Sequence, residues 1–294
     1  MKAYLKLIRW QNVLMIGAIQ YVWRYCLIFN YIPKQQSIFS DFQFAILVFA
    51  SMLIAAGGYA INDYFDIKAD QINKEADLVV SKLIKRTHVL RFHIFSGLLA
   101  SFLCLWVGWQ LNLFLWSLFG PLAILLLYLY SLYFKRTFLW GNLLISVLIA
   151  FLVFILAYLE IRLNGIAKES MELVLVFGGF AFFTNLIREI IKDVEDRRGD
   201  RLIGCRTVPI VLGVNKTKQL LVALILFCQA SILGITAIFR PDIIGFSFSF
   251  ILLIGPLSWC IYLIKFAQSN QSFHMASSWM KIIMLIGMFT ILLI

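Results

Sequence analysis

The sequence predicts an all-α integral membrane protein, with nine transmembrane helices around a central apolar cavity. Hydrophobic residues make up 62% of the 294 positions and charged residues only 14%, whereas an average soluble domain is about half apolar and a quarter charged. The apolar residues form continuous runs close to the ~20 residues that a helix needs to cross the hydrocarbon. The strands of a transmembrane β-barrel would alternate apolar and polar residues over ~10 positions. The apolar run at 121–128 is continuous and shows no such alternation.

Nine such runs follow one another along the chain. They cover residues 12–31, 42–61, 92–109, 112–134, 141–163, 171–191, 218–239, 243–266 and 276–294. The first is too long for the apolar core of a signal peptide, and no small-residue cleavage site follows it, so we interpret it as the first span. We expect residues 1–294 to form one polytopic domain.

Two acidic stretches share the spacing Asp-x-x-Asp-x-x-x-Asp and begin where an apolar run ends. They are Asp63, Asp66 and Asp70 after the second run, and Asp193, Asp196 and Asp200 after the sixth. Offsets of three and seven place three carboxylates on one helical face. The four-span displacement is compatible with a parallel repeat of two four-helix bundles plus one helix.

Lysine and arginine are distributed unevenly between the two sides of the predicted membrane. If the N-terminus lies on the inner side, all but five of the 26 lysines and arginines also lie on the inner side. The five exceptions are Arg24, Lys34, Arg162, Lys168 and Arg240. Cytoplasmic loops carry such an excess, so the N-terminus and both acidic stretches are predicted to face the cytoplasm, in the cell inner membrane. Contact with anionic lipid explains the net charge of +11, so we expect no nucleic-acid partner.

The acidic stretches favour a magnesium site that holds a phosphorylated ligand. Carboxylates without histidine or thiolate select hard cations, and Mg²⁺ prefers one or two carboxylates together with waters and phosphate oxygens. Basic residues flank both stretches and suit a diphosphate. Those around the acids are Lys68, Lys74, Arg188, Lys192, Arg197, Arg198, Arg201 and Arg206, and Lys135 and Arg136 are predicted on the same membrane face. The five cysteines form no C-x-x-C pair, so a thiolate metal site is not expected.

A phosphate site at the mouth of an apolar bundle indicates a lipid diphosphate. If the lipid is allylic, departure of the diphosphate leaves a carbocation, which aromatic faces stabilise. Aromatic residues make up 16% of the chain, although membrane interfaces also enrich them. The pairs Gly57–Gly58 and Gly178–Gly179 are interpreted mainly as points where helices pack closely.

At these residues the chain resembles the UbiA superfamily of intramembrane prenyltransferases. The matching blocks are Asn62-Asp-x-x-Asp66-x-x-x-Asp70, the second acidic stretch, Tyr130 to Arg136 followed by Gly141-Asn142, Gly204 to Pro209, and Arg9-Trp10-Gln11-Asn12. They occur in the family's order across nearly the whole chain. The resemblance implies Mg²⁺-dependent transfer of a prenyl group from a prenyl diphosphate to a lipid or aromatic acceptor, with membrane lipid around the protein.

The resemblance also implies roles for individual residues. Metal ligands, direct or through water, would be Asn62, Asp63, Asp66, Asp70, Asp193, Asp196 and Asp200, with Asp63 a candidate for indirect contact. Catalytic roles would fall to Asp66, Asp70, Asp193, Asp196 and Tyr130, the last orienting the diphosphate or stabilising the cation. Diphosphate contacts would come from Lys74, Lys135, Arg188, Lys192 and Arg206. Asn12 is the candidate for substrate binding.

Several alternatives remain open at this stage. Many family members follow the first motif with Arg-Pro and Ser-Gly, where this chain has residues 73–82 with Lys74. The second motif looks most like the branch that alkylates geranylgeranylglyceryl phosphate, while other branches prenylate quinone precursors or tetrapyrroles. A prenyl-diphosphate terpene cyclase on the same scaffold is an alternative function. A cation-coupled transporter is another, although carriers place acids near the bilayer midplane.

Overall fold

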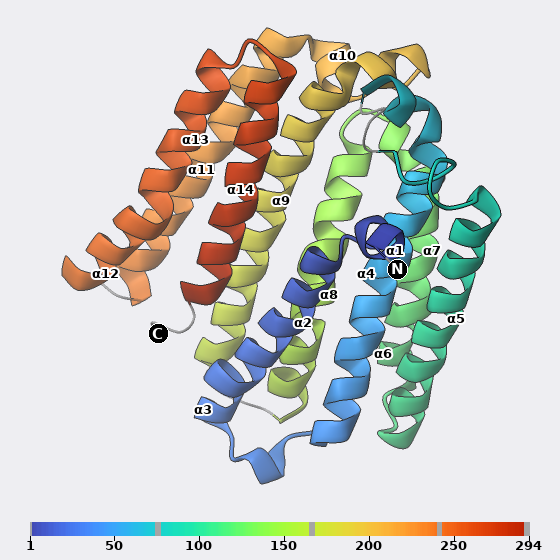
Figure 1. The fold of residues 1–294 in the computed structure, drawn as a ribbon. Helices are drawn as coiled ribbons and strands as arrows, with labels where there is room; N and C mark the ends of the chain where they lie inside the picture. Colours follow the sequence, from blue (N-terminus) through green and yellow to red (C-terminus); the bar gives the residue numbers. More distant parts are fainter. Residues whose placement is uncertain (1, 74–77, 165–167, 240–242, 291–294) are drawn as a thin grey trace. The chain divides into compact units, whose positions relative to one another are not determined.

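The structure, a computed structural model, describes residues 2–73, 78–164, 168–239 and 243–290 (Figure 1). Nearly all of them are helical, and the one β-bridge in these ranges joins Val80 and Ile84. Eight helical stretches in the described ranges are long and apolar enough to cross a membrane. A further helix, α14 (Asn270–Phe289), begins before the ninth predicted run, 276–294, and overlaps most of it. The all-α membrane architecture is therefore confirmed, with the count of nine approximate.

The chain divides into two compact units, each described by itself. The first comprises Met1–Phe134 and Phe151–Met171, and the second comprises Lys135–Ala150 and Glu172–Ile294. The division near residue 134 resembles the expected boundary between two bundles, with the helix α8 (Trp140–Asn164) contributing to both units. The predicted single domain and the central cavity remain predictions.

In the first unit, α4 (Asp41–Asn73) packs against α5 (Arg86–Gln110) and α7 (Phe119–Leu132), and α2 (Trp10–Trp23) also contacts it (Figure 1). A Cβ added at Gly57 would lie 2.6 Å from Ser96 Oγ, and one at Gly58 would lie 2.9 Å from Leu127 Cδ1. These glycines therefore allow α5 and α7 to approach α4 closely, as predicted. The short helices α1 (Lys2–Leu7), α3 (Phe29–Tyr31) and α6 (Phe114–Ser117) complete the unit.

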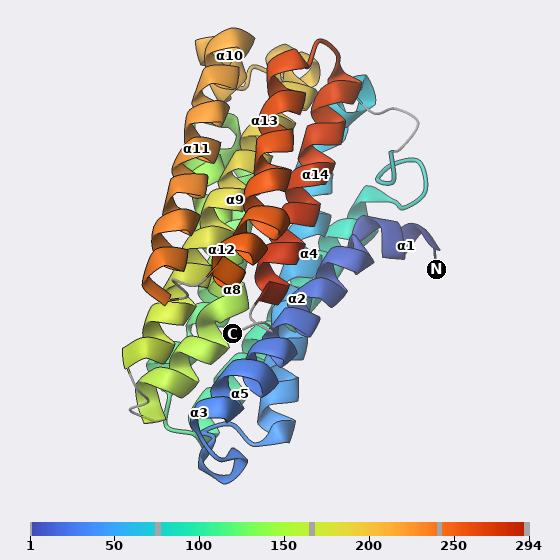
Figure 2. The ribbon, with the colours of Figure 1, turned by 90° about the vertical axis from the view of Figure 1, so that its left-hand side faces the viewer.

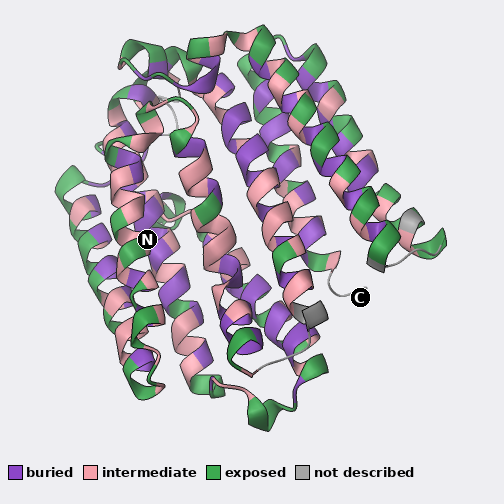
Figure 3. Ribbon diagram, turned by 180° about the vertical axis from the view of Figure 1, so that it is seen from behind, coloured by how far each residue is buried: buried purple, intermediate pink, exposed green. Residues whose placement is uncertain are grey.

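In the second unit, α9 (Lys168–Leu202) carries a buried apolar cluster that includes Ile187, Ile190 and Ile191. The other helices are α10 (Val208–Leu212), α11 (Val214–Phe239), α12 (Ile243–Ser249) and α13 (Gly255–Phe266). Helix α13 lies beside both α11 and α14 (Figure 2). Buried and exposed positions alternate along the helices (Figure 3), as expected for packed helices with a lipid-facing side.

The acidic stretches continue helices beyond their apolar parts. Helix α4 has 33 residues and α9 has 35, so each is about 50 Å long at 1.5 Å per residue. The hydrocarbon core is only ~30 Å thick. Both helices can therefore span it and still extend a rigid, carboxylate-bearing end beyond it. Both motifs lie on helices, as their spacing predicts.

Candidate active site

The first acidic row lies near the C-terminal end of α4. Because the helix runs through Asn73, Asn62, Asp66 and Asp70 share one face, as the spacing predicts. Asn62 Nδ2 donates a hydrogen bond to Asp66 Oδ2 at 2.8 Å, and Asp66 is only 9% exposed. The amide thus fixes one oxygen of a mostly buried carboxylate and leaves the other to a different partner.

Asp63 is held by a residue that sequence reasoning did not place in the site. Arg9 Nη2 lies 3.0 Å from Asp63 Oδ1, and its guanidinium lies 4.7 Å from the centre of the Tyr59 ring. Asn12 Nδ2 donates to the Tyr59 hydroxyl at 3.2 Å. Arg9 and Asn12 therefore join the start of α2 to α4 through Asp63 and Tyr59. The only sequence signal was the Arg9–Asn12 block of the resemblance.

The second acidic row lies near the C-terminal end of α9 and repeats the amide contact of the first. Asn142 Nδ2, on α8, donates to Asp193 Oδ2 at 2.9 Å. Asp200 and Glu189 place like charges near Asp193, and Lys135 places an opposite charge there. Asn142 is only 7% exposed. Asn142 belongs to the Gly141-Asn142 block of the resemblance, which implies no role for it, so its contact with Asp193 was not predicted from the sequence.

Two of the predicted phosphate-binding cations are engaged by Glu189. Arg188 Nη1 lies 2.7 Å from Glu189 Oε1, and Lys192 Nζ lies 3.6 Å from Glu189 Oε2. Arg188 Nε is buried without a hydrogen bond in the described structure. The pairing of Lys192 with Glu189, three residues apart on a helix, was readable from the sequence. A phosphate would have to compete with Glu189 for these cations.

The basic blocks around residues 135 and 206 meet within the second unit. The Arg206 backbone N–H donates to the Arg136 carbonyl at 2.8 Å. Arg206 itself is exposed, and Gly204 just before it has φ +79°, a backbone angle that favours glycine. The turn at Gly204 thus brings Arg206 beside the short 3₁₀ helix Phe134–Arg136.

The remaining predicted residues are more scattered. Tyr130 is buried, in the last turn of α7 in the first unit. Lys74 lies outside the described residues. Glu195, between two acids of the second row, is directed at α14, where its Oε1 lies 3.0 Å from His274 Nδ1. It is therefore not part of the row.

Within the described ranges, no three His, Cys, Asp or Glu side chains form a group that could hold a metal ion. Mg²⁺ is seldom held by an all-protein cage and takes one or two carboxylates plus phosphate and water oxygens. Each row offers oxygen donors alone, with one carboxylate fixed by an amide. The donor set fits Mg²⁺, and each unit holds half of the predicted site. That the halves share one ligand remains a prediction.

Comparison with known proteins agrees with this chemistry. A family model described as the UbiA prenyltransferase family matches residues 25–285. A digeranylgeranylglyceryl phosphate synthase of Sulfolobus acidocaldarius is 32% identical over 293 residues, covering 96% of this chain and 93% of its own length. The enzyme of the same name from Korarchaeum cryptofilum is 31% identical over 242 residues, 82% of each chain.

Solved structures share the fold. A UbiA homologue from Aeropyrum pernix K1, solved without ligand, has a TM-score of 0.67 at 14% identity and covers 92% of this chain and 94% of its own. A UbiA homologue from Archaeoglobus fulgidus, bound to DMAPP and Mg²⁺, has a TM-score of 0.63 at 18% identity and covers 99% of both chains. At these identities the likeness concerns the fold.

Proposed function

The chain belongs to the UbiA prenyltransferase family and is a prenyltransferase, and from this premise we propose that it transfers a prenyl group from an allylic prenyl diphosphate to the hydroxyl of a glycerol phosphate lipid. The allylic C–O bond to the diphosphate breaks, and the diphosphate leaves with the bonding electrons. A new C–O bond forms to the acceptor oxygen, whose proton passes to solvent. The acceptor class is supported by the relatives named digeranylgeranylglyceryl phosphate synthase.

One observation carries the proposal: each unit presents an acidic row of the same spacing in which an amide fixes one carboxylate. Asn62 orients Asp66, and Asn142 orients Asp193. A carboxylate held in this way keeps its second oxygen directed without reorganising during the reaction. Two such rows suit a ligand with two phosphates. The Archaeoglobus fulgidus homologue bound to DMAPP and Mg²⁺ supports this assignment.

The chain's own residues have separable tasks in this reaction. Asn62, Asp66, Asp70, Asp193, Asp196 and Asp200 would hold Mg²⁺, which neutralises charge on the departing diphosphate. Lys135, Arg188, Lys192 and Arg206 bind phosphate oxygens, and Glu189 restrains Arg188 and Lys192 until the ligand competes for them. Tyr130, which lies near the basic block in sequence, would orient the diphosphate or stabilise the developing cation with its ring. Asp63 positions Arg9, and Asn12 supports that contact through Tyr59.

Product analysis tests the proposal. Purified protein in nanodiscs is incubated with Mg²⁺, prenyl diphosphates of several lengths, and geranylgeranylglyceryl phosphate or 4-hydroxybenzoate, and the products are identified by mass spectrometry. We expect an ether-linked prenyl lipid and free pyrophosphate only when the glycerol phosphate lipid is present. Prenylation of 4-hydroxybenzoate alone would contradict the acceptor, and a cyclic product formed without any acceptor would identify a cyclase.

Variants of both rows test whether the rows perform the reaction. Asp66→Ala and Asp193→Ala should each lower kcat by roughly 10³-fold, as removal of a main electrostatic stabiliser does. Glu172→Ala is the matched control, because this acid lies on the same helix as Asp193 but in its N-terminal part. It should retain activity. Full turnover in both aspartate variants would contradict the proposal.

A further inference from the structure

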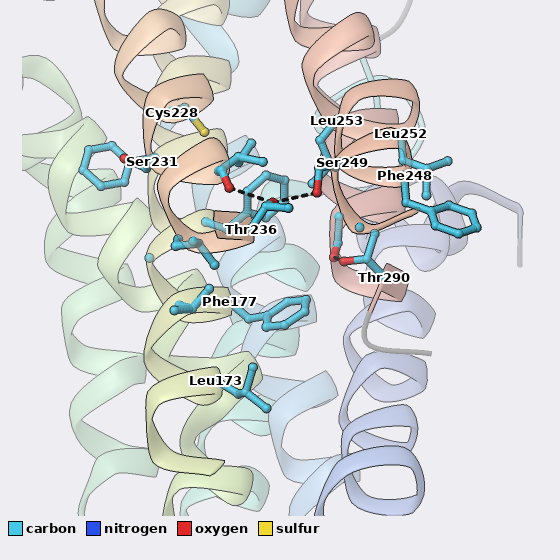
Figure 4. Close-up of a pocket in the computed structure, with 18 of the residues that line it drawn as sticks. Leu173, Phe177, Cys228, Ser231, Thr236, Phe248, Ser249, Leu252, Leu253 and Thr290 are labelled. Carbon is cyan, nitrogen blue, oxygen red and sulfur yellow. Dashed lines mark hydrogen bonds between the residues drawn. The ribbon is translucent and has the colours of Figure 1, made fainter. Parts of the chain in front are cut away.

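The second unit contains an apolar cavity far from its acidic row. The cavity has a volume of about 340 Å³ and lies among α9, α11, α12, the π-helix Phe250–Ile254 and α14. Its lining includes five phenylalanines, among them Phe177 and Phe248 (Figure 4). Its volume is more than twice the ~150 Å³ of an engineered apolar cavity that stays dry and binds benzene.

The polar groups of the lining are already satisfied by the protein. Thr236 Oγ1 donates to the Ile232 carbonyl at 2.9 Å and lies 2.7 Å from Ser249 Oγ (Figure 4). Ser231 Oγ donates to the Phe227 carbonyl at 2.9 Å, and Thr290 Oγ1 donates to the Gly287 carbonyl at 2.7 Å. Water needs two to four polar partners to occupy a cavity. These contacts leave few hydrogen-bonding groups for water or a polar ligand, so the lining favours a hydrocarbon as its occupant.

The cavity also has an apolar rim that is exposed. Leu175 is 63% exposed, Phe227 54% and Phe248 48%, and all three belong to the lining. In a membrane-spanning unit, such side chains face hydrocarbon. A lipid chain could therefore enter sideways from the bilayer without passing a polar barrier.

The wall of the cavity departs from regular helix. Residues Phe250–Ile254 form a π-helix, a distortion that often occurs at functional sites. Pro256 follows it and lacks the N–H that would bond the carbonyl four residues earlier. Across the cavity, a Cβ added at Gly179 would meet no heavy atom within 4 Å. Gly179 thus opens space rather than packing a helix, which corrects the packing interpretation for this glycine.

The position of the cavity separates it from the acidic row. Gly179 and Asp193 are 14 residues apart on α9, about 21 Å along the axis. Leu175, which also lines the cavity, lies 18 residues or five whole turns before Asp193 and so on the same face of α9, whereas Val176, Phe180 and Phe183 lie roughly a third of a turn around the helix. The cavity therefore differs from the row in its position along the α9 axis, and the prenyl chain of a donor held at the row is an alternative occupant that the test has to distinguish.

We propose that this cavity is a lipid site, in which one hydrocarbon chain of a bilayer lipid inserts between α9, α11 and the π-helix and completes the packing of the second unit. The exposed apolar rim provides the entrance, and the satisfied hydroxyls exclude polar occupants. Insertion of the lipid's hydrocarbon chain buries apolar surface of both the lipid and the protein. It also fills a void of a kind that packed interiors rarely contain. The assignment to a bilayer lipid does not rest on the proposed reaction.

Photocrosslinking tests the site directly. Full-length protein is reconstituted in phosphatidylcholine nanodiscs that contain a phospholipid with a mid-chain diazirine, and adducts are mapped by peptide mass spectrometry. We expect adducts on residues 173–183 and 248–253 at higher yield than on exposed apolar positions of α5, such as Leu98 and Phe102. Equal yields would overturn the proposal.

Two matched variants sharpen the test. Gly179→Leu fills the cavity and should lower those adducts roughly tenfold, the loss expected when about two buried methylenes are displaced. Gly234→Leu is the control, because a Cβ there also meets nothing within 4 Å and Gly234 does not line the cavity. Thermal unfolding checks that both leucine variants fold. If Gly179→Leu does not fold, the milder Gly179→Ala takes its place. An equal loss in both leucine variants would contradict the site.

Two further arms identify the occupant. Saturation with Mg²⁺ and a prenyl diphosphate should leave the adducts unchanged, and their disappearance would show that the donor's chain occupies the cavity instead. Adducts that appear only after removal of residues 291–294 would show that the chain's own end fills it. Either result would overturn the assignment to a bilayer lipid, and the prenyl transfer is judged separately by the product analysis.

Discussion

At the residue scale, Asp63 and Asp66 differ in what their carboxylates already hold. Arg9 Nη2 lies 3.0 Å from Asp63 Oδ1, whereas the Asn62 amide donates a hydrogen bond to Asp66 Oδ2 at 2.8 Å. Asp66→Asn should lower kcat by 10²–10³-fold. Asp63→Asn should lower it by less than ~10-fold, because a partly exposed ion pair contributes only about 0–1 kcal/mol. Steady-state kinetics on the two variants checks this, and equal losses would make Asp63 a direct ligand.

Asn142 provides a second prediction at this scale. Because its amide orients Asp193, Asn142→Ala should raise the Mg²⁺ concentration needed for half-maximal activity by about 10–100-fold, the usual cost of removing such a supporting contact. A Mg²⁺ titration of activity measures this. A variant whose Mg²⁺ dependence is normal and whose thermal stability alone falls would show that Asn142 serves only to pack α8 against α9.

Residues close in sequence were easier to place than residues brought together by folding. The spacing of the aspartates predicted two rows because helix periodicity fixes which positions share a face. The contact between Arg9 and Asp63 spans 54 positions and depends on how α2 meets α4, which no local pattern specifies. Asn142 and Asp193 are likewise joined only by the packing of α8 on α9.

At the scale of elements, the first span contains a π-helix, Arg24–Ile28, that carries a buried arginine. Arg24 is 1% exposed, and its Nη2 donates to the Phe39 carbonyl at 2.7 Å and to Asp41 Oδ1 at 3.2 Å. Its guanidinium lies 4.2 Å from the centre of the Phe44 ring. The pairing with Asp41 joins the end of the first span to the start of α4.

Removing Arg24 should therefore destabilise the first unit. Arg24→Ala should cost about 3 kcal/mol, typical of breaking a buried charged contact. Lys34→Ala is the control, because Lys34 is exposed and contacts the same Asp41 at 2.5 Å. That hydrogen bond raises the pKa of Lys34, but the exposed pair should leave the unfolding midpoint unchanged. Equal shifts in thermal unfolding in detergent would contradict the role of Arg24.

The apolar runs predicted the spans well but not their ends or irregularities. Helices α4 and α9 continue past the apolar runs through both acidic rows, because polar residues can extend a helix once packing has formed it. The two π-helices fall inside apolar runs, where hydrophobicity carries no sign of a change in hydrogen-bonding pattern. The glycine pairs looked alike in sequence, yet α4 uses its pair for close packing and Gly179 faces a cavity.

At the scale of the whole molecule, each unit accounts for half of the chemistry. The first contributes Asn62, Asp66 and Asp70, and the second contributes Asp193, Asp196 and Asp200. The sequence predicted both halves because each is local to one helix. It did not predict the helix contacts within each unit, because those depend on side-chain fit along the packed helices. The shared diphosphate is our proposal for what joins the halves.

A double-mutant cycle between Asp66 and Asp193 tests that proposal most directly. Binding of a non-reactive prenyl thiodiphosphate with Mg²⁺ is measured calorimetrically for the wild type, Asp66→Asn, Asp193→Asn and the double variant. If both rows hold one diphosphate, the losses are non-additive, with a coupling energy of about 1–3 kcal/mol. Losses that add to within about 0.5 kcal/mol would show that the rows bind independently, and the account would then be wrong.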